Sequence, residues 1–260
     1  GAYVKEPQVG MHKWVMSFDL NSLYPHLMMQ YNLSPEKMVD VDDATINSLW
    51  RNKSAYDNII AKEFDTSLLK QNDVTVAPNL MFFKRDSQGF LPEILEDLYD
   101  RRKTSKKKMI EAQQMAEKSD GVTKRRYLNQ VAKHNNDQLA RKVQLNSAYG
   151  ALGNQYFRFY DVRIAEAVTR AGQLSIRWIE TRMNEYLNKL LKTDDVDYVI
   201  ASDTDSIYVT LAGLVSQVFP EDAPKEKVVD FLDQVCSEKL EPYMSKCYNE
   251  LADYMNAYEQ

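Results

Sequence analysis

The stretch YVIASDTDSIYVT, residues 198–210, places two carboxylates at the bend of a predicted β-hairpin. Apolar, strand-forming residues precede and follow a short polar turn, a pattern typical of two paired strands. Asp203 and Asp205 alternate along the chain, so their side chains can point the same way. Carboxylates that are held together raise each other's pKa, and a bound Mg²⁺ removes that cost. The stretch therefore predicts a metal-binding hairpin, with a solvated turn built from aspartates as the alternative.

A second predicted strand, KWVMSFDL at residues 13–20, ends on a further acid, Asp19. Asp19 and Asp205 would then bridge two metal ions in the arrangement that serves in-line displacement at phosphorus. Elsewhere the pattern predicts a short helix that ends before Pro35 and one or two helices within residues 40–72. Residues 74–90 are expected to form a pair of strands closed by a turn at residues 86–89.

The composition fits a protein that holds a polyanion at one place. The 260 residues, 44% of them hydrophobic, suffice for one large domain or two small ones. Residues 101–142 contain 13 Lys/Arg and 4 Asp/Glu, a net of +9, whereas the rest of the chain contains 20 and 34, a net of −14. A solvated helical face is the alternative explanation for the basic segment.

The cysteine content and the hydropathy indicate an intracellular protein. Cys236 and Cys247 show neither a zinc-binding spacing nor a disulfide framework, which favours a reducing compartment. No apolar run approaches the ~20 residues of a membrane span, so no membrane partner is expected. The first ten residues also lack the apolar centre of a signal peptide.

Two long helices, residues 92–118 and 124–148, are predicted on either side of the break KSDGVT. Arg102 and Lys106 share a face of the first helix, and Lys142, Asn146 and Tyr149 share a face of the second. Arg102 lies 16 residues before the break and Lys142 18 residues after it, so both sets reach nearly the same height. Three converging cations match a triphosphate, and a pair of exposed basic helices is the alternative. Further helices are expected at residues 161–192 and at 225–258, the last interrupted at Pro242.

Three motifs together resemble the polymerase motifs of family B DNA polymerases, and they occur in the family's order. They are DLNSLYP at 19–25, KVQLNSAYG at 142–150 and SDTDSIYV at 202–209. The segments NSAYGALGN, FRFYDVR and WIETRMNEYLN are most similar to the replicative polymerases of T-even-type tailed bacteriophages. The resemblance implies an α+β fold: a palm whose antiparallel sheet is backed by long helices, plus a fingers domain of two antiparallel helices. It divides the chain into palm (1–90), fingers (91–149) and palm (150–260), with the exonuclease and thumb domains absent.

The resemblance also implies a role for each matching residue. Asp19 and Asp205 are the bridging ligands of two Mg²⁺ ions, for which Mn²⁺ is a substitute, and the Leu20 carbonyl is a third ligand. Asp203 has an auxiliary role in this set. Tyr24 corresponds to the steric gate that excludes a ribose 2′-hydroxyl, with an ordinary buried tyrosine as the alternative.

The remaining implied roles concern the nucleotide. Arg102 and Lys142 grip the triphosphate with Lys106 and Asn146 in support, and Lys142 also protonates the leaving pyrophosphate. Backbone amides of Ser22 and Leu23 contact the triphosphate. Tyr149 and Gly150 line the pocket beneath the nascent base pair.

The function implied is addition of dNMP to a primer 3′-hydroxyl with release of pyrophosphate. The implied partners are primer-template DNA, dNTPs, a sliding clamp and the missing exonuclease and thumb portions, and the location is the cytoplasm of an infected bacterial host. One alternative is a non-catalytic nucleotide- or DNA-binding subunit of a split polymerase. Another is a different palm nucleotidyltransferase such as a reverse transcriptase, against which the motif at 142–150 argues.

Three features depart from the family pattern. Ala201 and Ser202 replace the usual Tyr-Gly, from which we expect altered primer positioning or lower efficiency. His26 stands where the family commonly has a small serine, and we expect it to be a surface residue. The turn at residues 119–123 replaces a longer tip of the fingers.

Overall fold

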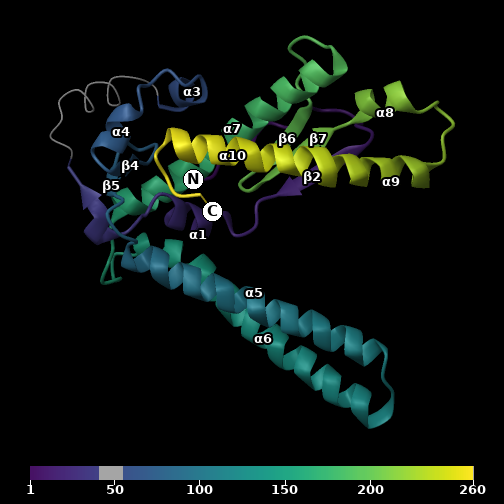
Figure 1. Cartoon of the computed structure of the whole chain (residues 1–260), viewed down its shortest axis with the longest axis horizontal. Helices are drawn as coiled ribbons and strands as arrows, with labels where there is room; N and C mark the ends of the chain where they lie inside the picture. The colour runs from purple at the N-terminus through teal and green to yellow at the C-terminus, as the bar shows by residue number, and fades with distance from the viewer. Residues whose placement is uncertain (41–54, 260) are drawn as a thin grey trace.

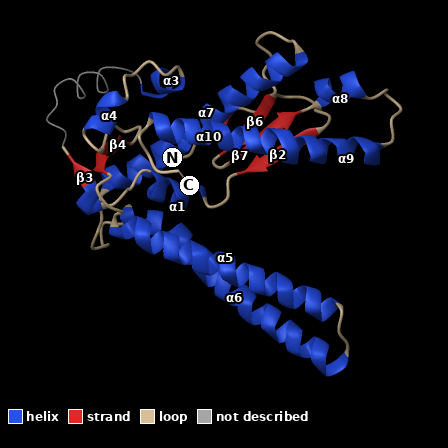
Figure 2. Cartoon of the chain, in the orientation of Figure 1, coloured by secondary structure: helices blue, strands red, loops and turns tan. Residues whose placement is uncertain are grey.

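The computed structural model describes residues 1–40 and 55–259, and its fold combines long helices with two small antiparallel sheets (Figure 1). This confirms the α+β class. Figure 2 shows the two sheets lying apart, with most of the chain around them helical. The part of the helix prediction for residues 40–72 that concerns residues 41–54 lies outside the described residues.

The larger sheet contains the hairpin predicted at residues 198–210. Its strand order is β1 (Val4–Lys5), β6 (Val199–Asp203), β7 (Ser206–Thr210) and β2 (Val15–Asp19), and every neighbouring pair is antiparallel. The turn between β6 and β7 consists of Thr204, with φ of 53°, and Asp205. In the β2–β7 pair Val15 lies opposite Thr210, and Asp19 lies opposite Ser206.

Helix α7 (Val162–Leu191) is the core element behind this sheet. Its apolar stripe is fully buried, as are the inward side chains of β6 and β7, including Val199, Ile207 and Val209. The indole nitrogen of Trp178 on α7 donates a hydrogen bond of 2.8 Å to the carbonyl of Cys247 on α10 (Glu241–Tyr254). Helices α7 and α10 are therefore joined by a polar bond inside an otherwise apolar core.

Several shorter elements complete the body of the molecule. They are α1 (Leu23–Gln30), η1 (Pro35–Lys37), α3 (Ala55–Ile60), α4 (Ser67–Gln71), α8 (Ala212–Val218), α9 (Lys225–Val235) and the π-helical turn η2 (Cys236–Leu240). The interruption expected at Pro242 takes the form of η2, which ends just before it. Because α9, η2 and α10 are continuous, the π-helical turn is where the hydrogen-bond ladder adjusts to Pro242, which has no amide hydrogen.

The smaller sheet corrects one prediction. Its strands β3 (Met38–Val39), β5 (Phe82–Lys84) and β4 (Val74–Val76) are antiparallel in that order. The turn between β4 and β5 lies at residues 77–81, where Leu80 has φ of 66°, and not at residues 86–89. Asp86 and Gly89 predict a hairpin turn, but in the structure they connect β5 to the start of a helix.

That helix is α5 (Phe90–Glu117), which packs antiparallel to α6 (Gly121–Leu152) and projects from the body of the molecule (Figure 1). We refer to α5 and α6 together as the helical hairpin. It confirms the two predicted helices, although α6 begins three residues earlier than expected. Buried small residues, including Ser105 and Ala112, lie along α5.

The N-terminus of α5 is anchored to the segment that follows α1. The side chains of Asn32, Ser34 and Glu36 accept hydrogen bonds from the amides of Gly89 (2.7 Å), Leu91 (3.4 Å) and Phe90 (2.8 Å), respectively. These amides have no partner within their own helix, so the three side chains cap it. The base of the helical hairpin is thereby fixed to the body.

The close approach at this base requires a glycine. A Cβ on Gly89 would lie 2.5 Å from Ser34 Cβ, whereas a Cβ on Gly153 would lie 3.7 Å from its nearest neighbour. We expect Gly89→Ala to lower the free energy of unfolding by about 2 kcal/mol, because the buried Ser34 side chain must shift. Gly153→Ala is the control and should change it by less than about 0.5 kcal/mol. Urea denaturation followed by circular dichroism measures both, and equal effects of the two substitutions would contradict this account.

Candidate nucleotide-binding site

A cavity of about 360 Å³ lies between the end of the larger sheet, the start of α1 and the helical hairpin. Nine of the predicted site residues line it: Asp19, Leu20, Ser22, Leu23, Tyr24, Arg102, Lys142, Asn146 and Asp205. Lys106, Asp203, Tyr149 and Gly150 do not line it. Segments that are about 190 residues apart in the sequence thus contribute to one cavity.

The acidic side of the cavity is built by the pairing of β2 with β7. The Leu20 amide donates a hydrogen bond of 2.8 Å to the Asp205 carbonyl, which fixes the end of β2 against the hairpin turn. Burial raises the pKa of the Asp205 carboxyl, and the negative charges of Asp19 and, to a smaller extent, Asp203 raise it further. The two acids of the cavity therefore lie close enough to repel each other.

Asp203 behaves differently from Asp205. Its carboxylate accepts a hydrogen bond of 2.9 Å from the Thr204 hydroxyl and is exposed. The left-handed conformation of Thr204 breaks the regular alternation of the strand, so only one of the two aspartates lines the cavity.

The oxygen atoms at this side fit a hard divalent cation. Mg²⁺ is typically held by one or two carboxylates together with substrate phosphates and water, and the two mutually repelling carboxylates match that donor set. No group of three or more His, Cys, Asp or Glu side chains suited to a metal occurs among residues 1–40 and 55–259. A cation at Asp19 and Asp205 would therefore take the rest of its coordination from water or from substrate phosphates.

The opposite side of the cavity is cationic. Arg102 of α5 donates a hydrogen bond of 3.0 Å from Nη1 to the Ser22 hydroxyl, and its buried Nε has no partner within the described part of the chain. Lys142 and Asn146 of α6 are exposed and point to the same cavity. Within the described ranges no salt bridge neutralises Arg102 or Lys142. Both cations are thus available for a bound anion.

The start of α1 adds backbone donors to this side. Ser22 precedes the helix with φ of 53° and ψ of 48°, and its side chain does not cap the helix. The amides of the first helical turn, including those of Leu23 and Tyr24, have no intrahelical acceptor. Free amides at a helix N-terminus favour a phosphate group.

Tyr24 forms the remaining, aromatic wall, and Tyr149 packs against it from outside the cavity lining. The ring of Tyr24 lies 4.8 Å from the ring of Tyr149, centroid to centroid, at an interplanar angle of 55°. Burial raises the pKa of Tyr24, as do the nearby Tyr149 and Asp205. Tyr149 is thus placed behind Tyr24, and Gly150 is exposed with no atom near the position of a Cβ.

The structure corrects the expectation for His26. The residue is half-buried: its ring packs edge-on against Tyr99 at 4.6 Å, and its Nδ1 lies 2.9 Å from the Ser22 carbonyl. Its position on α1, facing α5, could not be recognised before the two helices were placed. Three further residues line the cavity, namely Asn21, Pro25 and Thr204. Each lies inside a quoted motif, but none of them has an expected role.

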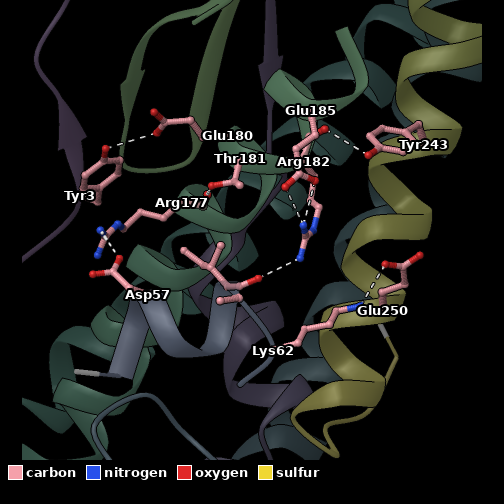
Figure 3. A pocket seen from close by; sticks show the side chains of 12 residues that line it. Tyr3, Asp57, Lys62, Arg177, Glu180, Thr181, Arg182, Glu185, Tyr243 and Glu250 are labelled. Atoms are coloured by element: carbon pink, nitrogen blue, oxygen red, sulfur yellow. Dashed lines mark hydrogen bonds and ion pairs between the residues drawn. The ribbon is translucent and has the colours of Figure 1, made fainter. Parts of the chain in front are cut away.

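A larger cavity of about 880 Å³ lies elsewhere, between the N-terminal segment, α3, α7 and α10 (Figure 3). Its charged side chains are paired with one another: Arg177 with Asp57 (3.2 Å), Lys62 with Glu250 (3.6 Å) and Arg182 with Glu185 (2.8 Å). Opposite charges that neutralise each other leave little attraction for a phosphate. The smaller cavity is therefore the candidate for a nucleotide site.

Comparison with known proteins identifies the class. The family model for DNA polymerase family B matches residues 1–219, and the chain belongs to this family. The predicted family is thus confirmed.

Two of the relatives are the DNA-directed DNA polymerases of Enterobacteria phage T4 and Escherichia phage RB69. They are 32% and 33% identical to the chain, and each alignment covers 98% of it. The chain covers 32% and 31% of these relatives, so it spans about a third of their length. DNA polymerase 1 of Pyrococcus abyssi is 29% identical over 92% of the chain and 24% of the relative.

Among the described residues, none of the helices combines the length and the apolar character that crossing a bilayer requires.

The repulsion between Asp19 and Asp205 predicts how stability responds to metal. Added Mg²⁺ at about ten times its dissociation constant should stabilise the wild-type chain by about 1.4 kcal/mol. Asp205→Asn should lose most of this gain, whereas Asp203→Asn should keep most of it. Thermal unfolding in EDTA and in MgCl₂ measures the difference, and an equal gain for all three proteins would contradict the assignment.

The same acid predicts a pH dependence in the absence of metal. The pKa of Asp205 is higher in the folded chain than in the unfolded chain, so between these values the folded state holds the extra proton. Its contribution to the free energy of unfolding therefore falls as the pH rises from the ordinary carboxyl pKa through the raised one. Asp205→Asn should flatten this decline in an EDTA-containing pH series, and an unchanged slope would contradict it.

Ser202 is one of the departures from the family pattern, and its replacement by alanine is expected to stabilise the fold. Its side chain is buried, and its hydroxyl has no hydrogen-bond partner in the described ranges. Ser202→Ala should raise the free energy of unfolding by about 1 kcal/mol, because an unsatisfied buried hydroxyl is costly. The control is Ser206→Ala, which removes a hydroxyl that donates to the Asp203 carbonyl at 3.2 Å and should destabilise. Urea denaturation distinguishes the two signs.

Proposed function

We propose that the chain is the catalytic core portion of a DNA-directed DNA polymerase, which adds dNMP to a primer 3′-hydroxyl and releases pyrophosphate. The observation that carries this proposal is the cavity that holds Asp19 and Asp205 on one side and Arg102 and Lys142 on the other. A module that only bound nucleic acid would have no need for repelling carboxylates opposite unpaired cations. Membership of DNA polymerase family B supports the same reaction.

In this proposal the triphosphate occupies the cationic side of the cavity. Arg102 and Lys142 contact its oxygens, Asn146 and Lys106 assist, and the amides of Ser22 and Leu23 donate to it. Lys142 also holds a proton on Nζ that it delivers to the leaving pyrophosphate.

Asp19, Asp205 and the Leu20 carbonyl would hold Mg²⁺, two ions in all, with Mn²⁺ as a substitute and Asp203 in an auxiliary role. The metal, when bound, lowers the pKa of the primer hydroxyl and neutralises charge on the phosphates. The acids lie on the sheet and the cations lie on the helical hairpin. Together they would hold the primer hydroxyl and the α-phosphorus of the dNTP next to each other.

Sugar and base contacts are assigned to the aromatic wall. Tyr24 occupies the space that a ribose 2′-hydroxyl would need, and Tyr149 packs behind it at 4.8 Å. Tyr149 and Gly150 lie beneath the nascent base pair and test its shape.

The proposed division of the chain follows from these roles. Residues 1–90 and 150–260 form a palm, and residues 91–149, which make up most of the helical hairpin, form the fingers. Proposed partners are primer-template DNA, dNTPs, a sliding clamp and exonuclease and thumb portions. Because two of the relatives are phage proteins, we place the protein in viral replication within an infected bacterium.

The alternative drawn from the sequence is a non-catalytic nucleotide- or DNA-binding subunit of a split polymerase. Primer extension with dNTPs and Mg²⁺ at low salt, beside the same assay with Asp205→Asn, separates the two. Extension by the wild-type chain that Asp205→Asn abolishes supports the polymerase. Metal-dependent nucleotide binding without any extension supports the subunit.

Neighbouring arginines on α5 offer a matched test of the triphosphate site. Arg102→Ala should weaken dNTP binding by about 10- to 100-fold, the loss expected for one charge-assisted contact. Arg101→Ala removes an exposed arginine that pairs with Asp97 at 2.9 Å and should leave binding unchanged. Isothermal titration calorimetry in MgCl₂ measures both, and equal losses would point to a general effect of charge instead.

A further inference from the structure

Helix α7 passes beneath α1 at a glycine. Gly172 is buried in the middle of α7, where glycine is a poorer helix former than alanine. Its φ is not in the left-handed region, so the backbone does not demand glycine. The absence of a side chain must therefore serve packing against a neighbour.

The neighbour is the aromatic wall of the cavity. A Cβ on Gly172 would lie 3.1 Å from Cε1 of Tyr24, closer than ordinary van der Waals contact. It would lie at ordinary distances, 3.7 Å, from the side chains of Leu23 and Leu27. Only the Tyr24 ring thus occupies the space that glycine leaves free.

A side chain at position 172 would move the Tyr24 ring. Gly172 lies on one side of it, and the Tyr149 ring lies 4.8 Å away, centroid to centroid. A methyl group at position 172 would push the ring away from α7 by a few tenths of an ångström. Because Tyr24 lines the cavity, this displacement changes the space that is left for a ligand.

We infer that Gly172 is a positioning residue that sets the depth of the Tyr24 ring and thereby the room for the nucleotide sugar. The inference rests on the proposed function, since it takes the sugar of a bound dNTP as the group that meets Tyr24. Gly172 itself does not touch the nucleotide and acts through the ring.

The test compares three probes in MgCl₂ by calorimetry: dATP, ATP and inorganic tripolyphosphate. Gly172→Ala should raise the dissociation constant of dATP about 3- to 10-fold and that of ATP at least as much. Tripolyphosphate has no sugar, so its affinity should change less than twofold. Gly213→Ala, where a Cβ would meet Leu191 at an ordinary 3.4 Å, is the control and should change none of the three.

Repeating the comparison in a Tyr24→Val variant isolates the contact between Gly172 and the Tyr24 ring. In Tyr24→Val the space is open, so adding Gly172→Ala should change dATP affinity less than twofold. It should also raise the melting temperature there, since alanine favours the helix, while lowering it in the wild-type background. Equal losses of dATP affinity in both backgrounds, or an equal loss of tripolyphosphate binding, would overturn the inference.

Failure of the proposed function gives a different result. If the wild-type chain binds neither dATP nor tripolyphosphate, the proposed function is contradicted and the assignment to the sugar falls with it. The melting temperatures still report separately whether Gly172 and Tyr24 are coupled.

Discussion

The register between β2 and β7 is the constraint on which the site depends. A shift of one residue in an antiparallel pair turns every side chain to the opposite face of the sheet. With Asp19 opposite Ser206, the end of β2 meets the hairpin turn, and the Leu20 amide bonds to the Asp205 carbonyl. Both acids then share a cavity, although Asp19 comes from the end of β2 and Asp205 from the turn between β6 and β7, far along the chain.

The helical hairpin meets this acidic edge because its base is anchored by polar side chains. Asn32 is fully buried and uses both ends of its amide group, donating to the carbonyls of Lys84 and Ser87 and accepting from Gly89. Such a fully bonded polar group specifies one geometry, since any other would leave it unsatisfied. The direction of α5, and hence the location of Arg102, follows from this local network.

The sequence was most informative where a pattern repeats over a short range. The hairpin at 198–210, the long helices and the convergence of Arg102 with Lys142 were all predicted from spacing. The misplaced turn at residues 86–89 shows the limit: Asp and Gly are as suitable for starting a helix as for closing a hairpin. The partial burial of His26 and the packing of Gly172 on Tyr24 depend on contacts between distant segments, which no local pattern encodes.

The anchored base of α5 has a mechanical consequence. Arg102 lies 12 residues after Phe90, about 18 Å from the anchor, and the helix continues to about 42 Å. Any difference in the direction of α5 at the caps is therefore amplified along the helix. A tilt of about 10° would displace Arg102 by about 3 Å and the far end of α5 by about 7 Å. The three cap hydrogen bonds that fix the direction of α5 therefore also set where Arg102 lies relative to the cavity.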